Sequence, residues 1–361
     1  FLGLYIGLTT AFAESVEALA ANMREVRPML VFSVPRVYEK IYARVQAAGM
    51  SGSPLKRALF RWCVAVGRQV SVLQQRHQPL PAGLRLRQRL AYQLVFKKLH
   101  QMVGGRLRFF VSGGAPLAQD ITEFFHAAGI LILEGYGLTE TCPALASNCY
   151  DRYKFGTVGR ALPDVELRIA ADGEILARGR NIARGYYKRP EATTEVFLED
   201  GWFATGDIGE IDAEGFLRIT DRKKDVIVTA GGKNIAPQNL ESLLKTDPYI
   251  SQAMVYGDRR PYLTAVLTLD LDAIRLYAQA HGIVADTAPA GAVHPQIQQL
   301  IEAHVAQCNA QLASYETIKK FIIAPTDFTP ESGELTPTLK VKRKVVTQRY
   351  QAQLDRLYEA G

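Results

Sequence analysis

The chain has 361 residues, of which 48% are hydrophobic and 22% charged, a composition ordinary for a soluble globular protein of two or three domains. Its four cysteines are too few for a disulfide framework, and no pair has metal-ligand spacing. Reduced thiols are therefore the simplest interpretation. The net charge of +7 leaves nucleic acid, a membrane surface and anionic small molecules open as partners.

The sequence opens with an apolar run, residues 1–13, that includes Thr9 and Thr10. No basic region precedes it, as one would in a signal peptide, and it is too short to span a bilayer. Because a soluble domain seldom begins in this way, we expect the sequence to start inside a domain.

Helical and strand patterns alternate up to about residue 158. Residues 107–111 and 130–133 are short apolar runs on either side of a helical pattern at 117–128. This strand–helix–strand order is typical of a parallel α/β sheet. The same part of the chain is predicted to contain helices at 14–27, 55–76 and 84–102 and a strand at 30–33.

The pattern changes from about residue 159. Alternating runs separated by Asp172-Gly173 and Glu214-Gly215 indicate antiparallel hairpins or a small barrel. After residue 225 the pattern is α+β. The runs of the first segment are 165–169, 174–177, 208–211 and 216–219, and those of the second are strands at 250–256 and 262–268 and helices at 271–281 and 295–312.

A polar, charged sequence, Asp-Arg-Lys-Lys-Asp at 221–225, is typical of a linker, although a charged turn inside one domain has the same composition. We place a boundary there. The prediction is one domain over residues 1–222, with an α/β part to about 158 and a β-rich part from about 159, and a small C-terminal domain over 223–361.

Two turns that follow predicted strands contain residues suited to a ligand. Ser-Gly-Gly-Ala-Pro-Leu at 112–117 opens a helix, and its glycines let a ligand approach the backbone. Glu-Gly-Tyr-Gly-Leu-Thr-Glu-Thr at 134–141 lies at the end of a strand, where open α/β sheets bind ligands. Tyr136 could stack on a base, Thr139 could bind a phosphate and Glu140 could hold Mg²⁺.

Two later residues are weaker candidates by themselves. Asp207, in Trp-Phe-Ala-Thr-Gly-Asp at 202–207, could accept hydrogen bonds from ribose hydroxyls, but aspartate is also a common turn residue. Lys340 lies in a basic segment near the C-terminus. Such a lysine can neutralise charge that develops in acyl or phosphoryl transfer, and a solvated basic tail is the alternative.

Taken in order, these motifs resemble the adenylate-forming superfamily of acyl-CoA synthetases, luciferases and peptide-synthetase adenylation domains. The resemblance implies nucleotide contacts from the two turns, a phosphate-binding Thr139, a Mg²⁺ ligand at Glu140 and a catalytic Lys340. It also implies a hinge at Lys224 and a coenzyme A tunnel beside Gly231. The nucleotide-binding residues that it implies are Gly114, Ala115, Pro116, Tyr136, Gly137, Asp207 and Arg222.

One position departs from the family's pattern. The family usually has glycine before the catalytic lysine, and this sequence has Leu339. Lys342 is therefore the alternative to Lys340.

Narrower features resemble the long-chain acyl-CoA synthetases. These are Val-Phe-Ser-Val-Pro-Arg-Val-Tyr-Glu-Lys at 31–40 and a long helical insert over 49–104. The family's Ser/Thr/Gly-rich phosphate loop does not occur in this sequence. The resemblance thus implies an N-terminally truncated chain that cannot adenylate by itself.

The implied fold is that of the adenylate-forming enzymes, with a parallel α/β subdomain, a small β-barrel-like subdomain and a mobile C-terminal α+β domain. The implied activity is that of an AMP-forming long-chain fatty acid–CoA ligase. Its substrates would be a fatty acid, ATP with Mg²⁺, and coenzyme A. A fatty acyl-AMP ligase and a non-catalytic pseudoenzyme scaffold are the alternatives.

Basic runs at 85–89 and 97–98 are either solvated helix faces or contacts with an anionic membrane surface. No aromatic-and-basic strand pattern supports nucleic-acid binding. We expect a cytoplasmic protein, with peripheral contact at the inner membrane surface as the further possibility.

Overall fold

The computed structural model describes residues 2–5, 7–15, 18–50, 53–283 and 293–359. Its contacts divide the chain into two compact units. The first unit comprises Phe1–Ser33, Gly49–Ser112 and Thr122–Leu133, and the second comprises Val34–Ala48, Gly113–Ile121 and Glu134–Gly361.

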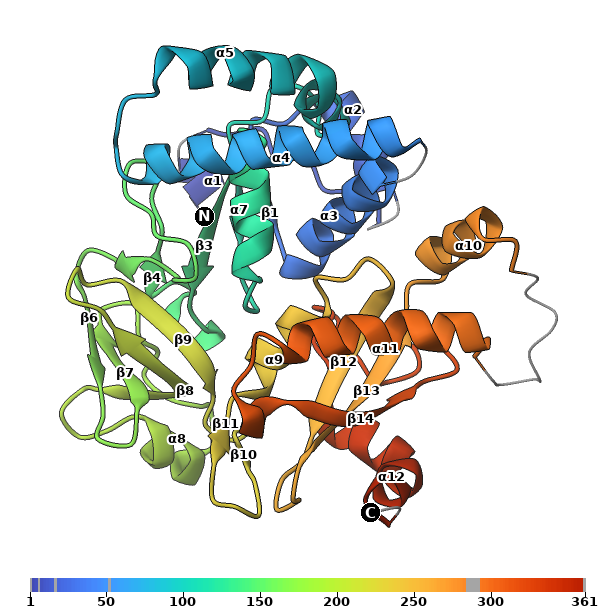
Figure 1. Cartoon of the computed structure of the whole chain (residues 1–361). Coiled ribbons are helices and arrows are strands. Elements are labelled where there is room, and N and C mark those ends of the chain that lie inside the picture. Colours follow the sequence, from blue (N-terminus) through green and yellow to red (C-terminus); the bar gives the residue numbers. More distant parts are fainter. Residues whose placement is uncertain (1, 6, 16–17, 51–52, 284–292, 360–361) are drawn as a thin grey trace. The chain divides into compact units, whose positions relative to one another are not determined.

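The first unit contains parallel strands and a set of helices (Figure 1). Strand β1 (Leu30–Ser33) pairs in parallel with β2 (Phe109–Ser112), and β3 (Leu131–Tyr136) follows β2 in the sheet. This confirms the parallel arrangement predicted for the first strands. The helices of this part are α1 (Leu2–Tyr5), α2 (Leu19–Val26), α4 (Pro54–Gln75), α5 (Ala82–Ala91), the π-helix η1 (Tyr92–Phe96), α6 (Lys97–Met102) and α7 (Gln119–Ala127).

Local sequence explains where the long helix α4 begins. The side chain of Ser53 accepts a hydrogen bond from the backbone N–H of Lys56, and Pro54 occupies the first helical position, where its missing N–H costs nothing. At the N-terminus the predicted helix over 14–27 is shorter than expected, because α2 begins only at Leu19. The core of this unit contains an edge-to-face pair of Phe110 and Phe125 with ring centroids 6.0 Å apart.

The second unit begins with a helix that the sequence pattern did not predict, α3 (Pro35–Met50). In this unit the end of β3 pairs antiparallel with β4 (Ala146–Ser147), and β4 pairs antiparallel with β5 (Arg160–Ala161). The first sheet therefore contains a parallel part and an antiparallel edge that the sequence pattern did not predict. A parallel edge strand needs a long crossover, whereas β4 and β5 follow β3 through short loops and so run antiparallel.

The β-rich segment forms one four-stranded antiparallel sheet. Its strands are neighbours in chain order, as hairpin connections require, and the run 165–169 predicts the first strand correctly. Between the second and third strands lies the short helix α8 (Pro190–Val196). The strands are β6 (Val165–Ile169), β7 (Glu174–Gly179), β8 (Phe203–Ile211) and β9 (Leu217–Arg222).

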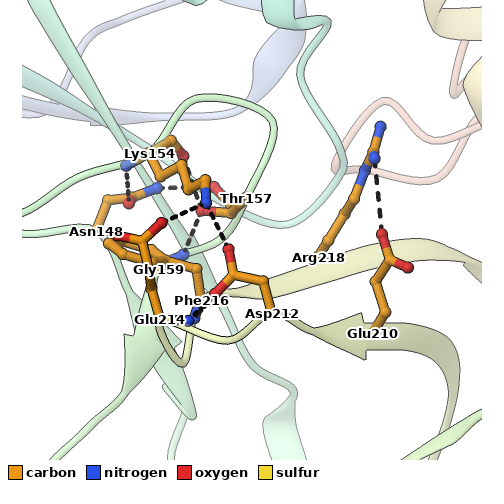
Figure 2. Close-up of polar contacts among 9 residues, drawn as sticks. All are labelled: Asn148, Lys154, Thr157, Gly159, Glu210, Asp212, Glu214, Phe216 and Arg218. Carbon is orange, nitrogen blue, oxygen red and sulfur yellow. Dashed lines mark hydrogen bonds and ion pairs between the residues drawn. The ribbon is translucent and has the colours of Figure 1, made fainter. Parts of the chain in front are cut away.

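The loop between β4 and β5 is attached to the β8–β9 turn by a polar cluster (Figure 2). The Lys154 ammonium lies 2.7 Å from Asp212 and 2.8 Å from Glu214. Asn148 donates to the carbonyl of Thr157 and accepts from the backbone N–H of Lys154. The buried cluster of Tyr136, Leu145, Ala146, Ile175, Ala177 and Leu217 joins the same two sheets beneath. The ends of β3 and of β8 are thereby held in a fixed relation.

Residues after 222 form an α+β arrangement, as predicted. A three-stranded sheet has the order β12 (Ile250–Tyr256), β13 (Leu263–Leu269), β14 (Ile318–Ile323). Its first pair is antiparallel and its second parallel, and separate buried clusters cover its two faces. The other elements are the strands β10 (Ile227–Val228) and β11 (Asn234–Ile235) and the helices α9 (Pro237–Leu244), α10 (Leu271–Ala280), α11 (Pro295–Asn309), η4 (Ser314–Glu316) and α12 (Arg343–Glu359).

The predicted boundary at residues 222 and 223 falls at the end of β9, inside the second unit. It therefore stays a prediction. Among the helices of the described residues, none combines the length and the hydrophobicity that crossing a membrane requires.

Candidate functional site

A cavity of about 720 Å³ lies in the second unit. Its walls come from the start of α3, the loop before α7, the end of β3, the paired strands β8 and β9, helix α9 and the segment before α12. Eight of the predicted site residues line it, namely Gly114, Ala115, Pro116, Tyr136, Gly137, Asp207, Arg222 and Lys340. Residues up to 226 positions apart in sequence thus meet around one space.

Two glycines shape the turns that border the cavity. Gly114 has a φ of +87°, a left-handed conformation that side chains rarely adopt. A Cβ atom on Gly137 would lie 1.6 Å from the carbonyl oxygen of Pro143, so no side chain fits there. These two positions require glycine for the loops to approach the cavity closely.

Asp207 is the central charged residue of the cavity wall. Its carboxylate accepts a hydrogen bond from the Tyr136 hydroxyl at 2.7 Å and another from Arg222 Nε at 3.1 Å. Arg222 stands directly opposite Asp207 across the β8–β9 pair. Burial raises the pKa of Asp207, while the hydrogen bonds from Tyr136 and Arg222 and the positive charge of Lys340 act in the opposite direction. The protein itself therefore holds a hydrogen-bonded acceptor ready for ligand hydroxyls.

Tyr136 is 8% exposed, and its ring and its hydroxyl make different contacts. Its ring belongs to the buried cluster beneath the site, and its hydroxyl is oriented by Asp207. Burial, together with the neighbouring Asp207 charge, raises the pKa of Tyr136 above its usual range. The hydroxyl thus keeps its proton and remains a donor to Asp207 at ordinary pH.

Lys340 lies in a tight hairpin. Leu335 and Val341 form a bridge at its base, and the N–H of Thr336 donates to the carbonyl of Lys340 at 2.8 Å. Leu339 adopts a φ of +61°, and its side chain packs against the buried cluster between α12 and the last sheet. The left-handed conformation explains physically why glycine suits this position.

Lys340 and Asp207 both line the cavity, and their charges influence each other's pKa. The pKa of Lys340 is lowered, first because the cavity removes the group from water and second because Arg222 is nearby. Lys342 also lines the cavity. The charge of Lys340 is one of the influences that lower the pKa of Asp207, and the choice between the two lysines stays a prediction.

Thr139 and Glu140 lie in the short 3-10 helix η2 (Thr139–Thr141) that follows the cavity-lining Leu138. Glu140 accepts a hydrogen bond from the Tyr186 hydroxyl at 2.7 Å. Among the described residues no group of three histidines, cysteines or carboxylates could enclose a metal ion. A single carboxylate fits Mg²⁺ held mainly by phosphate oxygens and water, which is the usual manner of this cation.

Lys224 and Gly231 lie outside the cavity lining. Lys224 is exposed in the turn after β9. Its neighbour Lys223 is attached to the sheet through Asp172 at 2.6 Å and Glu174 at 2.7 Å. Gly231 is exposed between β10 and β11. The chain is therefore anchored immediately before Lys224.

Sequence reasoning missed Glu134 as a cavity residue. Its carboxyl lines the cavity and is 7% exposed, and burial raises its pKa to about 8. No sequence signal could have indicated this burial, because a glutamate before Gly135 is equally compatible with a surface turn.

Arg36 and Glu39 were also missed. Arg36 donates to the carbonyl of Ser251 at 2.6 Å, and Lys245 pairs with Glu39 at 2.8 Å. Both residues line the cavity from α3. The segment that contains them, Pro-Arg-Val-Tyr-Glu-Lys, indicated only a resemblance to long-chain acyl-CoA synthetases. No other sequence signal could have identified Arg36 and Glu39 as cavity residues.

Comparison with known proteins places this site in a family. A model described as AMP-binding enzyme matches residues 1–187, and one described as AMP-binding enzyme C-terminal domain matches residues 224–361. The chain is 42% identical over 354 residues to the long-chain-fatty-acid–CoA ligase FadD15 of Mycobacterium bovis, an alignment that covers 97% of this chain and 58% of the relative. It is 34% identical over 390 residues to the long-chain-fatty-acid–CoA ligase ACSBG2 of Rattus norvegicus, covering 100% of this chain and 58% of the relative.

Solved structures agree with this fold. The adenylation domain of a carboxylate reductase from Mycobacterium chelonae has a TM-score of 0.71 and 26% identity, covering 95% of this chain and 48% of that one. The corresponding domain from Segniliparus rugosus, solved with AMP and a co-purified carboxylic acid, has a TM-score of 0.68 and 26% identity, covering 96% and 49%. The chain thus spans about half to three fifths of the length of these proteins. Since a family model matches more than half of its residues, the chain belongs to the AMP-binding enzymes, the adenylate-forming family.

Proposed function

We propose that the protein is an AMP-forming long-chain fatty acid–CoA ligase. Its reaction would join a fatty acid to the adenylate of ATP, release pyrophosphate, and then transfer the acyl group to coenzyme A with release of AMP. The observation that carries the proposal is the meeting of Tyr136, Asp207, Arg222 and Lys340 around one cavity. The identity to long-chain ligases over nearly the whole chain supports the substrate class.

In this proposal Asp207 binds the ribose, because its acceptor oxygens are already oriented by Tyr136 and Arg222. The loop of Gly114, Ala115 and Pro116 borders the adenine, and Gly137 lets the nucleotide approach the end of β3. Such positioning and charge neutralisation provide most of the catalysis in phosphoryl and nucleotidyl transfer.

Lys340 neutralises the charge that develops as the carboxylate attacks the α-phosphate. Burial and the nearby Arg222 lower the pKa of Lys340, and the charge of Asp207 acts in the opposite direction. Thr139 contacts phosphate oxygens from η2. Mg²⁺, when bound by Glu140 together with phosphate oxygens, would supply further charge neutralisation at the leaving pyrophosphate.

We propose also that residues 223–361 form a mobile domain that turns about Lys224. Support comes from Lys223, which fixes the preceding turn to Asp172 and Glu174, so that rotation would begin after it. Gly231 would then move toward the cavity, where it would border the path of the pantetheine arm, while Lys340 would leave.

The experiment that tests the function uses the protein expressed from its complete reading frame. It is incubated with Mg²⁺, ATP, coenzyme A and saturated fatty acids of increasing length, and the products are identified by mass spectrometry. We expect acyl-CoA mainly from long acids. Acyl-AMP without acyl-CoA would instead identify an acyl-AMP ligase, and no adenylate with any acid would identify a pseudoenzyme.

A second arm uses the 361-residue chain alone. Because it has no Ser/Thr/Gly-rich phosphate loop, we propose that it turns over no ATP. Robust turnover by this chain would contradict that part of the proposal.

The location of the protein belongs to the same proposal. We place it in the cytoplasm, with peripheral contact at the inner membrane surface, because long-chain fatty acids partition into bilayers and a ligase there meets its substrate at high local concentration.

A further inference from the structure

The continuous helical stretch from α5 through η1 to α6 has two apolar faces. One face is turned inward and contains Leu84, Ala91 and Val95, which are buried or half-buried. On the opposite side Leu86, Leu90 and Leu94 follow one another at intervals of four residues, with exposed fractions of 61%, 49% and 48%. Residues four apart lie on one side of a helix, so these three leucines form a single exposed row, here called the leucine row.

Cations border the leucine row on both sides. Arg85, Arg87 and Arg89 alternate with its leucines, and Lys97 and Lys98 follow in α6, all of them exposed. Among the described residues, none of these five forms an ion pair with a carboxylate within 4 Å. An apolar row flanked by exposed arginines and lysines is the pattern of a helix that lies in a membrane interface.

The charge of the surrounding sequence is strongly one-sided. Residues 40–119 contain fourteen lysines and arginines and no aspartate or glutamate. The rest of the chain has 29 basic and 36 acidic side chains, so its balance is negative. The positive net charge of the protein therefore arises in this one stretch, and a partner for it has to be anionic.

The neighbouring helix α4 continues the same surface. It packs alongside α5 within the first unit (Figure 1). Leu55, with an exposed fraction of 79%, and Trp62, with 38%, lie exposed on it. Lys56, Arg57 and Arg61, which are also exposed, are their neighbours in sequence. A tryptophan beside cations is a typical anchor at the level of lipid headgroups.

We propose that the α4–α6 surface docks on an anionic phospholipid bilayer, with the leucine row inserted among the acyl chains and the cations on the headgroups. A nucleic acid would be attracted by the cations but would leave the leucine row in water, so the combination favours a bilayer. The inference deepens the proposed function and rests on it for the reason to be at a membrane. The docking places the enzyme at the source of its fatty acid substrate.

The test measures partition of the full 361-residue chain, without ATP or fatty acid, onto phosphatidylcholine vesicles with and without 30% phosphatidylglycerol. We expect binding to the anionic vesicles that weakens as salt is raised, because exposed charges are screened. Replacing Arg85, Arg87 and Arg89 by glutamine should lower the partition coefficient by about 100-fold, since each cation near such a surface contributes roughly fivefold.

A second variant addresses insertion. Leu86→Gln with Leu90→Gln should lower partition by at least about tenfold while preserving helix propensity. Matched controls remove equivalent groups elsewhere. Arg259, Lys319 and Arg356 replaced by glutamine, and the pair Leu271→Gln and Leu276→Gln on exposed positions of α10, should partition like the parent. Circular dichroism confirms that each variant is folded.

Three results would overturn the proposal. These are equal partition of the parent and both α5 variants, no partition onto anionic vesicles by either the chain or the protein from its complete reading frame, and binding of RNA that survives competition by vesicles. Because partition is measured without substrates, a failure here is distinguishable from failure of the ligase activity, which is measured with fatty acid dispersed in detergent.

Discussion

The β8–β9 pair and helix α5 carry charge in opposite ways. On the pair, Asp207 is enclosed and bonded to Tyr136 and Arg222. In the turn that follows β9, Lys223 is exposed but has two carboxylate partners. On α5, three arginines within five positions are exposed, without a carboxylate partner in the described part of the chain. Where charge is enclosed, the fold supplies the counter-charge, and its removal should be costly. Where charge is exposed and one-signed, the counter-charge comes from salt ions or from another molecule.

The largest effect is expected for Lys340, the lysine that lines the cavity. Lys340→Ala should lower the rate of adenylate formation by about 100- to 1000-fold, the usual loss when one preorganised charge is removed from a transition state. Pyrophosphate exchange into ATP, with the protein from its complete reading frame and a long-chain acid, measures it. Lys342→Ala is the matched variant and should retain most activity. A greater loss in Lys342→Ala would transfer the role to that residue.

Backbone crowding at the cavity should also be costly. Gly137→Ala places a methyl group against the carbonyl oxygen of Pro143, so we expect a loss of about 1–3 kcal/mol in the free energy of unfolding and weaker AMP binding. The matched change on α5 is Gly83→Ala, where a Cβ meets nothing within 4 Å. It should be neutral or stabilising by up to about 1 kcal/mol. Urea unfolding measures the stability of both variants. Equal losses in Gly137→Ala and Gly83→Ala would contradict the prediction that crowding at the cavity is costly.

Glu134 should give the cavity a pH dependence. Its pKa of about 8 in the folded protein lies above the value of about 4.3 in an unfolded chain. Between these values the folded state binds one proton more, so the free energy of unfolding falls as pH rises, by up to about 1.4 kcal/mol per pH unit.

Glu134→Gln should remove this slope, changing the difference in stability between pH 6 and pH 8 by about 2 kcal/mol. Urea unfolding at the two pH values measures it, with the exposed Glu331→Gln as control. If the parent and Glu134→Gln had parallel pH profiles, the carboxyl would be ionised in the folded protein.

A smaller effect is expected at Tyr136. Tyr136→Phe keeps the buried ring but leaves one oxygen of Asp207 without its donor, which should cost about 1–2 kcal/mol of stability and lower AMP affinity several-fold. Tyr186→Phe removes the hydroxyl that donates to the half-buried Glu140 instead and should change stability by less. Calorimetric titration with AMP and thermal unfolding are measured for both variants. A larger loss of affinity and stability in Tyr186→Phe than in Tyr136→Phe would contradict the role proposed for Asp207.

The smallest effect on stability is expected on α5 itself. Replacing Arg85, Arg87 and Arg89 by glutamine should alter the free energy of unfolding by less than about 0.5 kcal/mol, as is usual for exposed positions without partners. A loss of several kcal/mol in chemical unfolding would mean that these arginines serve the fold, and the comparison with β8 and β9 would no longer hold.

Local sequence pattern was sufficient for strands that either alternate in polarity or form a bounded apolar run. The run 165–169 predicts β6 correctly, and 250–256 predicts β12, because side-chain alternation or a bounded apolar run specifies a strand. It failed for α3, which begins at Pro35 and whose polar residues Arg36 and Glu39 are half-buried and buried. Strands β4 and β5 have two residues each, too few for any period to show.

The cavity set was found through motifs, and the structure brings eight of those residues together. The motifs could not predict which of these residues form hydrogen bonds with each other. The hydrogen bond of Tyr136 to Asp207 joins residues 71 positions apart, and nothing local in either segment specifies it. Burial of Glu134 has the same origin, since it depends on which chain segments cover the end of β3.

Leu339 affects how easily the hairpin that carries Lys340 changes its conformation. A glycine before Lys340 would leave the hairpin to sample many backbone conformations, and order would have to be restored in every catalytic cycle. The leucine side chain, packed in the cluster around Met254 and Val266, fixes that order once, when the chain folds. Any outward swing of Lys340 that deforms the hairpin must then pull a leucine out of an apolar cluster. If the proposed rotation occurs, the packing of Leu339 opposes the departure of Lys340 from the cavity.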